Sequence, residues 1–193
     1  MKQVHPLIAH IESIVPLTDA EAAKVLQAFY PKLLKKREIL LFKGDISSHM
    51  RFIESGSLRS YYIDAAAQER ILQFGIEGWW INDLYSYLTQ TPAEYFIQAV
   101  EASMVLQIHR DSLEALFQQV PAMERFFRIK IQRAYVALQE RTMRTLSQSA
   151  EQRYIEFRQK YREIEQRVPQ YMIASYLGIT PEHLSTIRKG LLS

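Results

Sequence analysis

The sequence has 193 residues and contains no cysteine. This absence excludes disulfide bonds, thiol redox sensing and an iron–sulfur cluster held by cysteine ligands. No run of 18 apolar residues occurs, which excludes a membrane-spanning helix and gives no reason to expect a membrane partner. The N-terminal residues lack the pattern of a signal peptide, so we expect a cytoplasmic protein.

The sequence also lacks the motifs of common enzymes. It contains no Gly-x-Ser-x-Gly elbow, no P-loop and no Gly-x-Gly-x-x-Gly fingerprint. No His-x-His pair occurs among the histidines, which are His5, His10, His49, His109 and His183. A metal site on neighbouring strands needs such clustered ligands. We therefore predict a protein that is not an enzyme and holds no metal and no cofactor; a metal-dependent enzyme of the cupin type is the disfavoured alternative.

Charge is distributed unevenly along the chain. Residues 1–120 carry 11 Lys and Arg against 14 Asp and Glu, a net charge of −3. Residues 121–193 carry 13 against 7, a net charge of +6. A basic C-terminal portion is typical of a nucleic-acid partner, although an ordinary solvated helix surface rich in arginine would look the same.

The most informative stretch is residues 168–189, which we interpret as two short helices joined by a tight turn. Pro169 suits the first turn of the first helix. Gly178 follows the last apolar residue, where a left-handed conformation is needed. Thr180 can cap the second helix, with Pro181 at its first position. The pattern predicts a helix-turn-helix, and a plain helical hairpin is the alternative.

The second of these helices has two chemically different faces. Its apolar residues fall on one face: Leu184, Ile187 and Leu191. Its short polar and charged residues fall on the other: Glu182, Ser185, Thr186 and Lys189. A helix that reads the major groove needs this division, because its outer face must meet base edges and phosphates.

Residues before 120 indicate two helices followed by many short strands. A helix is expected over 3–14, and the capping-box sequence of residues 18–21 opens a second helix. Short apolar runs separated by turns then predict an antiparallel barrel or jelly roll: 38–42, 51–54, 58–63, 68–75, 94–99 and 104–109. The Ser55-Gly56 turn between two of these runs predicts a β-hairpin. The spacing of Asp111 and Glu114 again suits a capping box.

A long helix is predicted from Pro121. Its apolar stripe has a 4-3-4-4 spacing: Phe127, Ile131, Ala134, Leu138 and Thr142. The stripe predicts a coiled-coil seam between two copies of the chain, and packing on the chain's own strands is the alternative. A further amphipathic helix is expected over 148–161, followed by a charged linker over 162–167.

Residues 173–189 resemble the C-terminal DNA-binding part of the Crp/Fnr superfamily of bacterial transcription regulators. The likeness rests on Ile173-Ala174, Gly178, the run from Thr180 to Ser185, and Ile187-Arg188-Lys189. Residues 43–45 and 52–58 are similar to the first turns of a cyclic-nucleotide-binding roll. The order of elements matches the family over nearly the whole chain.

The resemblance implies an α+β fold. Residues 1–120 would form a jelly-roll-like antiparallel β-roll with flanking helices, 121–146 a long dimerisation helix, and 147–193 a helix-turn-helix domain. It implies a homodimeric transcription regulator that binds double-stranded DNA, and it makes RNA polymerase a candidate partner. The open alternative is a ligand-sensing or protein-interaction module that no longer reads DNA.

The resemblance also assigns candidate DNA contacts in the recognition helix, residues 181–189. They are Thr180, Pro181, Glu182, His183, Ser185, Thr186, Arg188 and Lys189. Glu182 lies where the family has a base-reading glutamate, which could accept a hydrogen bond from cytosine. Four residues follow Lys189, whereas the family usually continues into a β-hairpin wing. We therefore expect no full wing and fewer phosphate contacts.

Cyclic-nucleotide-binding relatives carry a Gly-Glu pair for the ribose and an arginine for the phosphate. Here Asn82-Asp83 replaces the pair, Glu94-Tyr95-Phe96 lies where the arginine is expected, and no cation occurs between Arg70 and Arg110. Burying a phosphate without a cation is costly, so we expect no response to cyclic AMP.

The same region offers candidate residues for a pocket that takes an uncharged effector of unknown identity. They are Trp79, Trp80, Asn82, Asp83, Tyr85, Tyr95 and Phe96. The alternative, which we favour, is that the aromatic side chains fill the roll as core.

Overall fold

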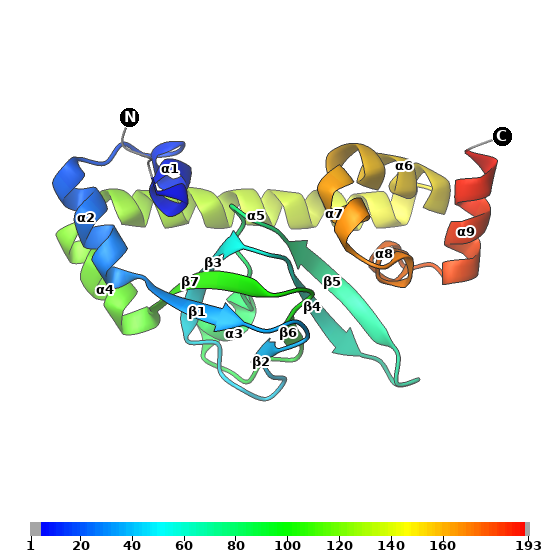
Figure 1. Ribbon diagram of the computed structural model, residues 1–193, viewed down its shortest axis with the longest axis horizontal. Coiled ribbons are helices and arrows are strands. Elements are labelled where there is room, and N and C mark those ends of the chain that lie inside the picture. Colours follow the sequence, from blue (N-terminus) through cyan, green and yellow to red (C-terminus); the bar gives the residue numbers. More distant parts are fainter. Residues whose placement is uncertain (1–4, 192–193) are drawn as a thin grey trace.

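The computed structural model describes residues 5–191 (Figure 1). Its helices are α1 (Pro6–Glu12), α2 (Asp19–Ala28), α3 (Leu84–Thr89), α4 (Arg110–Gln119), α5 (Ala122–Ser147), α6 (Ala150–Lys160), α7 (Arg162–Arg167), α8 (Gln170–Leu177) and α9 (Pro181–Gly190). Its strands are β1 (Tyr30–Leu34), β2 (Ile39–Leu41), β3 (His49–Ser55), β4 (Leu58–Ile63), β5 (Glu69–Gly75), β6 (Phe96–Ala99) and β7 (Ser103–His109). None of these helices, α5 included, combines the length and apolarity needed to cross a bilayer.

The strands form two antiparallel sheets, so the predicted α+β fold with an antiparallel roll is confirmed. One sheet has the order β1-β7-β3 and the other the order β2-β6-β4-β5. The two sheets pack through a core that we call the roll core: Leu34, Leu40, Leu41, Ile53, Leu58, Ile81, Ala93, Ile97, Ala99 and Val105. Each sheet keeps its own edges, so the roll is open and not a closed barrel.

The predicted hairpin between β3 and β4 is wrong. β3 pairs with β7, whereas β4 pairs with β5 and β6, so the turn at Gly56 carries the chain from one sheet to the other. The free edge of β3 is used by the segment before α3: the Ile53 N–H donates to the Trp79 carbonyl at 2.8 Å, and the Ile81 N–H donates to the Arg51 carbonyl at 3.1 Å. Because these bonds take the edge that a hairpin would need, β4 pairs elsewhere.

The helices at the N-terminal end cover the first sheet. We call their shared core the N-terminal core: Leu7, Ile8, Ile11, Val15, Val25, Phe29, Met50, Phe52, Tyr87, Leu106, Ile108, Leu113, Leu116, Val120, Met123, Phe126 and Phe127. The predicted capping box of α2 is confirmed, with the Thr18 N–H donating to Glu21 Oε2 at 2.9 Å. The cap predicted at Asp111 is wrong, because β7 runs directly into α4 and His109 Nδ1 accepts from the Asp111 N–H at 3.3 Å.

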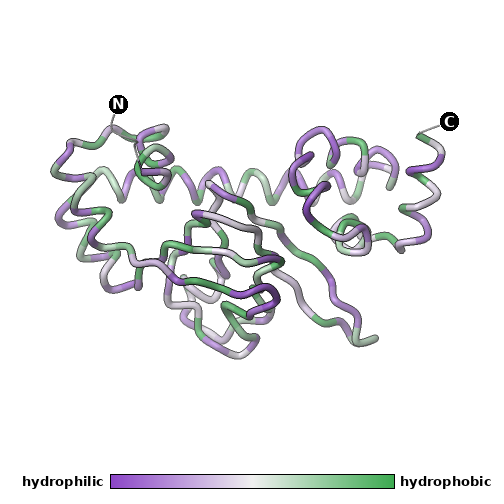
Figure 2. The backbone as a smooth tube through the Cα atoms, viewed as in Figure 1, coloured by the Kyte–Doolittle hydropathy of each residue, from purple (hydrophilic) through white to green (hydrophobic). Residues whose placement is uncertain are grey.

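Helix α5 runs along the whole molecule and joins its two ends (Figure 1). Hydrophilic and hydrophobic residues alternate along its middle (Figure 2). The C-terminal helices α6 to α9 gather around its last turns. The stretch predicted as a charged linker, residues 162–167, forms the short helix α7 because Ile164 faces inward and is only 2% exposed.

The C-terminal helices are docked on β5. We call the core at this contact the junction core: Tyr61, Ile71, Phe74, Ile76, Tyr154, Phe157, Ile164, Val168, Met172, Ile173, Ala174, Leu177, Leu184 and Ile187. Polar contacts extend it, since Ser175 Oγ donates to the Glu69 carbonyl at 2.8 Å and accepts from the Ile71 N–H at 3.0 Å. The roll and the helix-turn-helix therefore share one core in this structure. The domain boundaries at 120 and 146 stay predictions.

Candidate nucleic-acid interface

Helices α8 and α9 are joined by the predicted glycine turn. Gly178 has φ of 71°, a left-handed conformation that a residue without Cβ adopts at little cost. The Ile179 N–H donates to the Ala174 carbonyl at 3.0 Å, which satisfies the open end of α8. Pro169 was predicted in the first turn of α8 but occupies the N-cap position directly before it, without a side-chain capping hydrogen bond.

The start of α9 has the predicted cap. Thr180 Oγ1 accepts from the His183 N–H at 3.2 Å, and Pro181 occupies the first helical turn, where its missing N–H costs nothing. Leu184 and Ile187 are buried and hold α9 against the junction core. Leu191, predicted on the same face, is 36% exposed and contributes less.

The structure brings the eight predicted DNA contacts onto one exposed surface, which we call the α9 surface. It consists of Thr180, Pro181, Glu182, His183, Ser185, Thr186, Arg188 and Lys189, all of which are exposed. Leu184 and Ile187 are the buried side chains of α9, so the division into two faces is as predicted.

Glu182 is held in its ionised form. Its own backbone N–H and the Thr180 hydroxyl form hydrogen bonds that lower the pKa of its carboxyl group. An acid in the first turn also interacts favourably with the helix dipole. A carboxylate fixed at this position is a pure acceptor and is chemically able to meet a donor on a base edge. The expectation about a missing wing concerns a segment that lies outside the described residues.

The predicted stripe on α5 needs correction at one position. Phe127 is 4% exposed and packs in the N-terminal core, so its side chain is not available to a second chain. Ala134 is exposed and, like Ile131 and Leu138, lies beside a cavity between α5 and the roll. The exposed apolar stripe continues instead through residues that sequence reasoning missed: Tyr135 (61% exposed) and Leu146 (79% exposed). Counting heptads from Ile131 would have found Tyr135, whereas Leu146 lies one residue beyond the heptad position at 145.

We call the corrected set the α5 stripe. It consists of Ile131, Tyr135, Leu138, Thr142 and Leu146. Ile131 is half-buried, Leu138 is 61% exposed, and Thr142 is exposed. The spacing is again 4-3-4-4, and its first three steps follow the alternating 4-3 heptad pattern of a seam between two helices.

The residues predicted to line one effector pocket do not form one site. Asp83 caps α3 by accepting from the Ser86 N–H at 2.9 Å, and Tyr85 is 68% exposed. Phe96 stacks on Tyr61 with ring centroids 5.2 Å apart. The Tyr95 hydroxyl donates to the Asn82 carbonyl at 3.3 Å. Asp83 therefore serves as a cap, and Tyr95 and Phe96 pack against the cores, which is the alternative that the sequence favoured for the aromatic residues; Tyr85 does neither.

Three residues of that set do face a common space, a cavity of about 640 Å³ between the roll and α5 that we call the roll cavity. They are Trp79, Trp80 and Asn82. Lys130 and Arg133 of α5 line the same cavity. The sequence argument found no cation because it considered only the residues between Arg70 and Arg110, whereas α5 brings two from elsewhere in the chain.

These cations affect a buried histidine beside the cavity. His10 packs its ring against Phe52 at 5.5 Å and Phe126 at 5.9 Å. Burial, followed by the charges of Lys130 and Arg133, lowers its pKa to about 4. The histidine is therefore neutral at physiological pH. Among the described residues, no group of three or more histidines and carboxylates is placed to hold a metal ion.

Comparison with known proteins agrees with this architecture. Residues 31–120 match the cyclic nucleotide-binding domain family. The anaerobic regulatory protein of Haemophilus influenzae is 27% identical over an alignment of 169 positions that covers 81% of this chain and 64% of that protein. The chain is thus similar to a bacterial regulatory protein over most of its own length. It spans less than two thirds of the length of that Haemophilus relative.

Solved structures of bacterial regulators share the fold of this chain. The c-di-GMP responsive global regulator CLP of Xanthomonas campestris superposes with a TM-score of 0.72 at 15% identity, covering 91% of this chain and 92% of that one. A putative regulator of the crp/fnr family from Eubacterium rectale gives a TM-score of 0.67 at 16% identity, covering 91% and 84%. The described relatives carry the names of regulators and not of enzymes.

Proposed function

We propose that this chain is a transcription regulator that binds double-stranded DNA as a homodimer and has no catalytic activity of its own. The observation that carries the proposal is the α9 surface, in which exposed polar residues project from a helix anchored by Leu184 and Ile187. This is the arrangement of a recognition helix in a major groove. RNA polymerase is a candidate partner of such a regulator.

The proposed dimer forms through the α5 stripe. Exposed apolar side chains at heptad spacing lose contact with water when two such helices pair. Pairing along α5 would place two copies of α9 at the same end of the assembly. A twofold dimer then reads two half-sites whose spacing mirrors its own symmetry.

The proposed regulator does not respond to cyclic AMP. The two side chains at the position of the family's Gly-Glu pair are already used within the protein. Asn82 Oδ1 accepts from the Arg51 N–H at 2.8 Å, and Asp83 caps α3. Lys130 and Arg133 line the roll cavity. At the position of the family's Gly-Glu pair, however, no carboxylate is free to bind the hydroxyl groups of a ribose. Calorimetry with cyclic AMP and cyclic GMP should show no binding tighter than about millimolar.

The test of DNA binding is selection of bound sites from random duplexes by the full chain. Enrichment of a twofold-symmetric sequence, with an affinity that falls steeply as salt rises, is the expected result. If no sequence is enriched and binding does not depend on salt, the result would instead favour a protein-interaction module that no longer reads DNA.

A further inference from the structure

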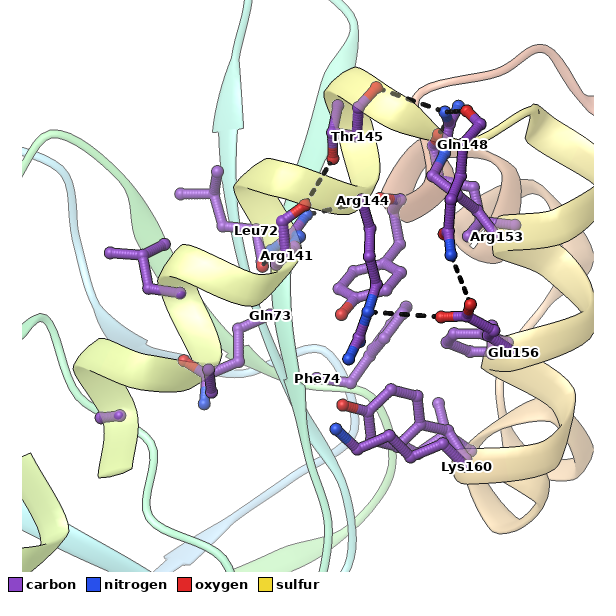
Figure 3. Close-up of a pocket in the computed structure, with 18 of the residues that line it drawn as sticks. Leu72, Gln73, Phe74, Arg141, Arg144, Thr145, Gln148, Arg153, Glu156 and Lys160 are labelled. Atoms are coloured by element: carbon purple, nitrogen blue, oxygen red, sulfur yellow. Dashed lines mark hydrogen bonds and ion pairs between the residues drawn. The ribbon is translucent and has the colours of Figure 1, made fainter. Parts of the chain in front are cut away.

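A second cavity lies where the roll, α5 and the C-terminal helices meet, and we call it the junction cavity (Figure 3). Its volume is about 350 Å³, which is in the range of pockets for small molecules. Leu72 to Phe74 of β5 form one wall, α5 contributes residues between Ala134 and Thr145, and α6 and α8 close the other side. It adjoins the roll cavity, which lies nearer the start of α5 and shares four lining residues with it: Gln73, Trp79, Ala134 and Ala137.

Aromatic rings dominate the apolar part of the junction cavity. Phe157 lies 5.5 Å from both Tyr161 and Tyr176, measured between ring centroids. Phe74 lies 5.5 Å from Tyr176, and Trp79 lies 5.8 Å from Tyr161. Rings that meet at offset and edge-to-face angles leave faces and edges on which a further flat ring can pack.

The polar part of the junction cavity is strongly positive. Its lining includes Arg141, Arg144, Arg153 and Lys160 against a single acid, Glu156. Arg144 extends across the space to Glu156, with Nε and Oε2 3.3 Å apart (Figure 3). Arg144 also pairs with Glu140 outside the lining, at 3.0 Å. The four cations still outnumber these two carboxylates, so an anion entering the cavity is electrostatically favoured.

Two buried polar atoms of the lining have no hydrogen-bond partner. They are Arg153 Nε, a donor, and Gln148 Oε1, an acceptor. The other nitrogens of Arg153 are bound, with Nη1 donating to the Gln148 carbonyl at 2.8 Å and Nη2 to the Leu177 carbonyl at 3.1 Å. Buried polar groups are nearly always paired, so a missing partner points to an unseen molecule.

We propose that the junction cavity binds a small planar aromatic carboxylate that also carries a hydrogen-bond donor. Its ring packs among the aromatic side chains, its carboxylate faces the arginines, and its donor meets Gln148. Such a ligand touches β5, α5, α6 and α8 together. If the protein binds DNA as proposed above, the ligand therefore changes the affinity for DNA by fixing α9 relative to the roll.

The site is tested by calorimetry on the full chain with two probes, salicylate and indole-3-acetate. At least one should bind with a dissociation constant below about 1 mM, roughly the lower limit of specific recognition. Salicylamide, which has the same ring without the charge, and cyclohexanecarboxylate, which has the charge without the ring, should each bind at least about tenfold more weakly. Absence of binding by both aromatic acids, or equal binding by the controls, overturns the proposal.

Two variants test whether the aromatic acid binds in the junction cavity. Lys160→Gln removes an exposed cation of the lining, and Thr145→Trp fills the cavity from the surface of α5; each should weaken binding at least about tenfold. The matched control is Arg128→Gln, on the same helix as Thr145 but outside the cavity, which should bind as the parent does. Equal binding by all variants means that the acid binds elsewhere and overturns the proposal.

The effect on DNA is measured separately, on a selected duplex with and without saturating ligand. A shift in DNA affinity of at least about threefold that disappears in Thr145→Trp supports the coupling, and an unchanged affinity overturns it. If the chain binds no DNA at all, the proposed function fails while the calorimetric result still decides the site.

Discussion

The two ends of α5 are held by different physical means. At its start, Met123 and Phe126 are fully buried in the N-terminal core. Near its end, Arg141 donates to the Leu72 and Tyr176 carbonyls, and Arg144 pairs with Glu156. Apolar burial is nearly independent of salt, whereas exposed charge pairs are screened by it. The attachment of the last turns of α5 is thus more sensitive to salt than that of its first turns, while the apolar junction core holds the DNA-binding helices on the roll.

The largest expected effect is on stability and comes from a substitution at the start of α5, which is held by apolar burial. Phe126→Ala should reduce the free energy of unfolding by about 3–5 kcal/mol, because it leaves a cavity among tightly packed rings. Denaturant unfolding followed by circular dichroism measures the loss. Val136→Ala, on an exposed part of the same helix, is the control and should change the stability by less than about 0.5 kcal/mol. Similar losses for both would mean that α5 is held evenly along its length.

A second prediction concerns the exposed middle of α5, which neither end holds. Combining Tyr135→Asp with Leu138→Asp should weaken self-association at least about a hundredfold, or roughly 2.7 kcal/mol, because pairing would bury unpaired charge. Sedimentation velocity over a range of concentrations measures it. Val136→Asp adds an acid outside the α5 stripe and should leave the dimer intact. A double variant that stays dimeric would place the interface elsewhere.

A third prediction tests whether the salt-sensitive end also carries sequence specificity. Glu182→Ala should relax the preference at one base pair per half-site by about 1–3 kcal/mol, because its acceptor would no longer be matched to a base donor. Lys189→Ala should instead weaken binding to all sequences and reduce the salt slope by about one unit per half-site. Both are measured on single-base variants of a selected site at several salt concentrations. If Glu182→Ala lowers affinity evenly with its preference unchanged, α9 is not docked as proposed.

The smallest effect concerns the ion pair that ties α7 to the roll. Arg167 Nη1 lies 2.6 Å from Glu77 Oε2, and hydrogen bonds from Arg167 lower the pKa of Glu77 from 4.5 to about 2. A depressed carboxyl pKa stabilises the folded state above pH 4.5, and this contribution is lost as pH falls towards 2. Hydrogen exchange in α7 and α8 should therefore accelerate over that interval.

Arg167→Gln should show this faster exchange at neutral pH, with a loss of unfolding free energy below about 1 kcal/mol because the pair is partly exposed. Arg162→Gln, on the same short helix, serves as the control. Exchange that does not respond to Arg167→Gln would mean that the junction core alone holds α7 in place.

Features set by neighbouring residues could be predicted from the sequence, and features set by distant ones could not. The caps at Thr18 and Thr180 and the turn at Gly178 depend on residues within a few positions, and all are confirmed. The hairpin at Gly56 failed because the partner of a strand is decided by competition across the whole sheet. A turn between two sheets and a turn within one look the same in sequence.

The candidate sites also differ in whether neighbouring or distant residues form them. The α9 surface lies on one helix, so helical periodicity was enough to find it. The roll cavity combines Trp79 with Lys130, and the junction cavity combines Leu72 with Arg141 and Phe157. Such combinations depend on the path of α5 over the roll, which no local pattern contains. The predicted stripe included the buried Phe127 because periodicity gives the spacing of a stripe but not which side of α5 faces outward.

The neighbouring Trp79 and Trp80, the only tryptophans in the chain, lie in different surroundings. Trp80 contacts Phe127 of the N-terminal core with ring centroids 5.1 Å apart, whereas Trp79 faces Tyr161 of the C-terminal helices. Their indole emission therefore reports on opposite ends of the molecule from adjacent positions. In Trp80→Phe the remaining fluorescence follows only the contact with the DNA-binding helices, and in Trp79→Phe it follows only the N-terminal core. The chain thus carries its own pair of optical probes, and movement between its two parts can be timed without attaching a dye.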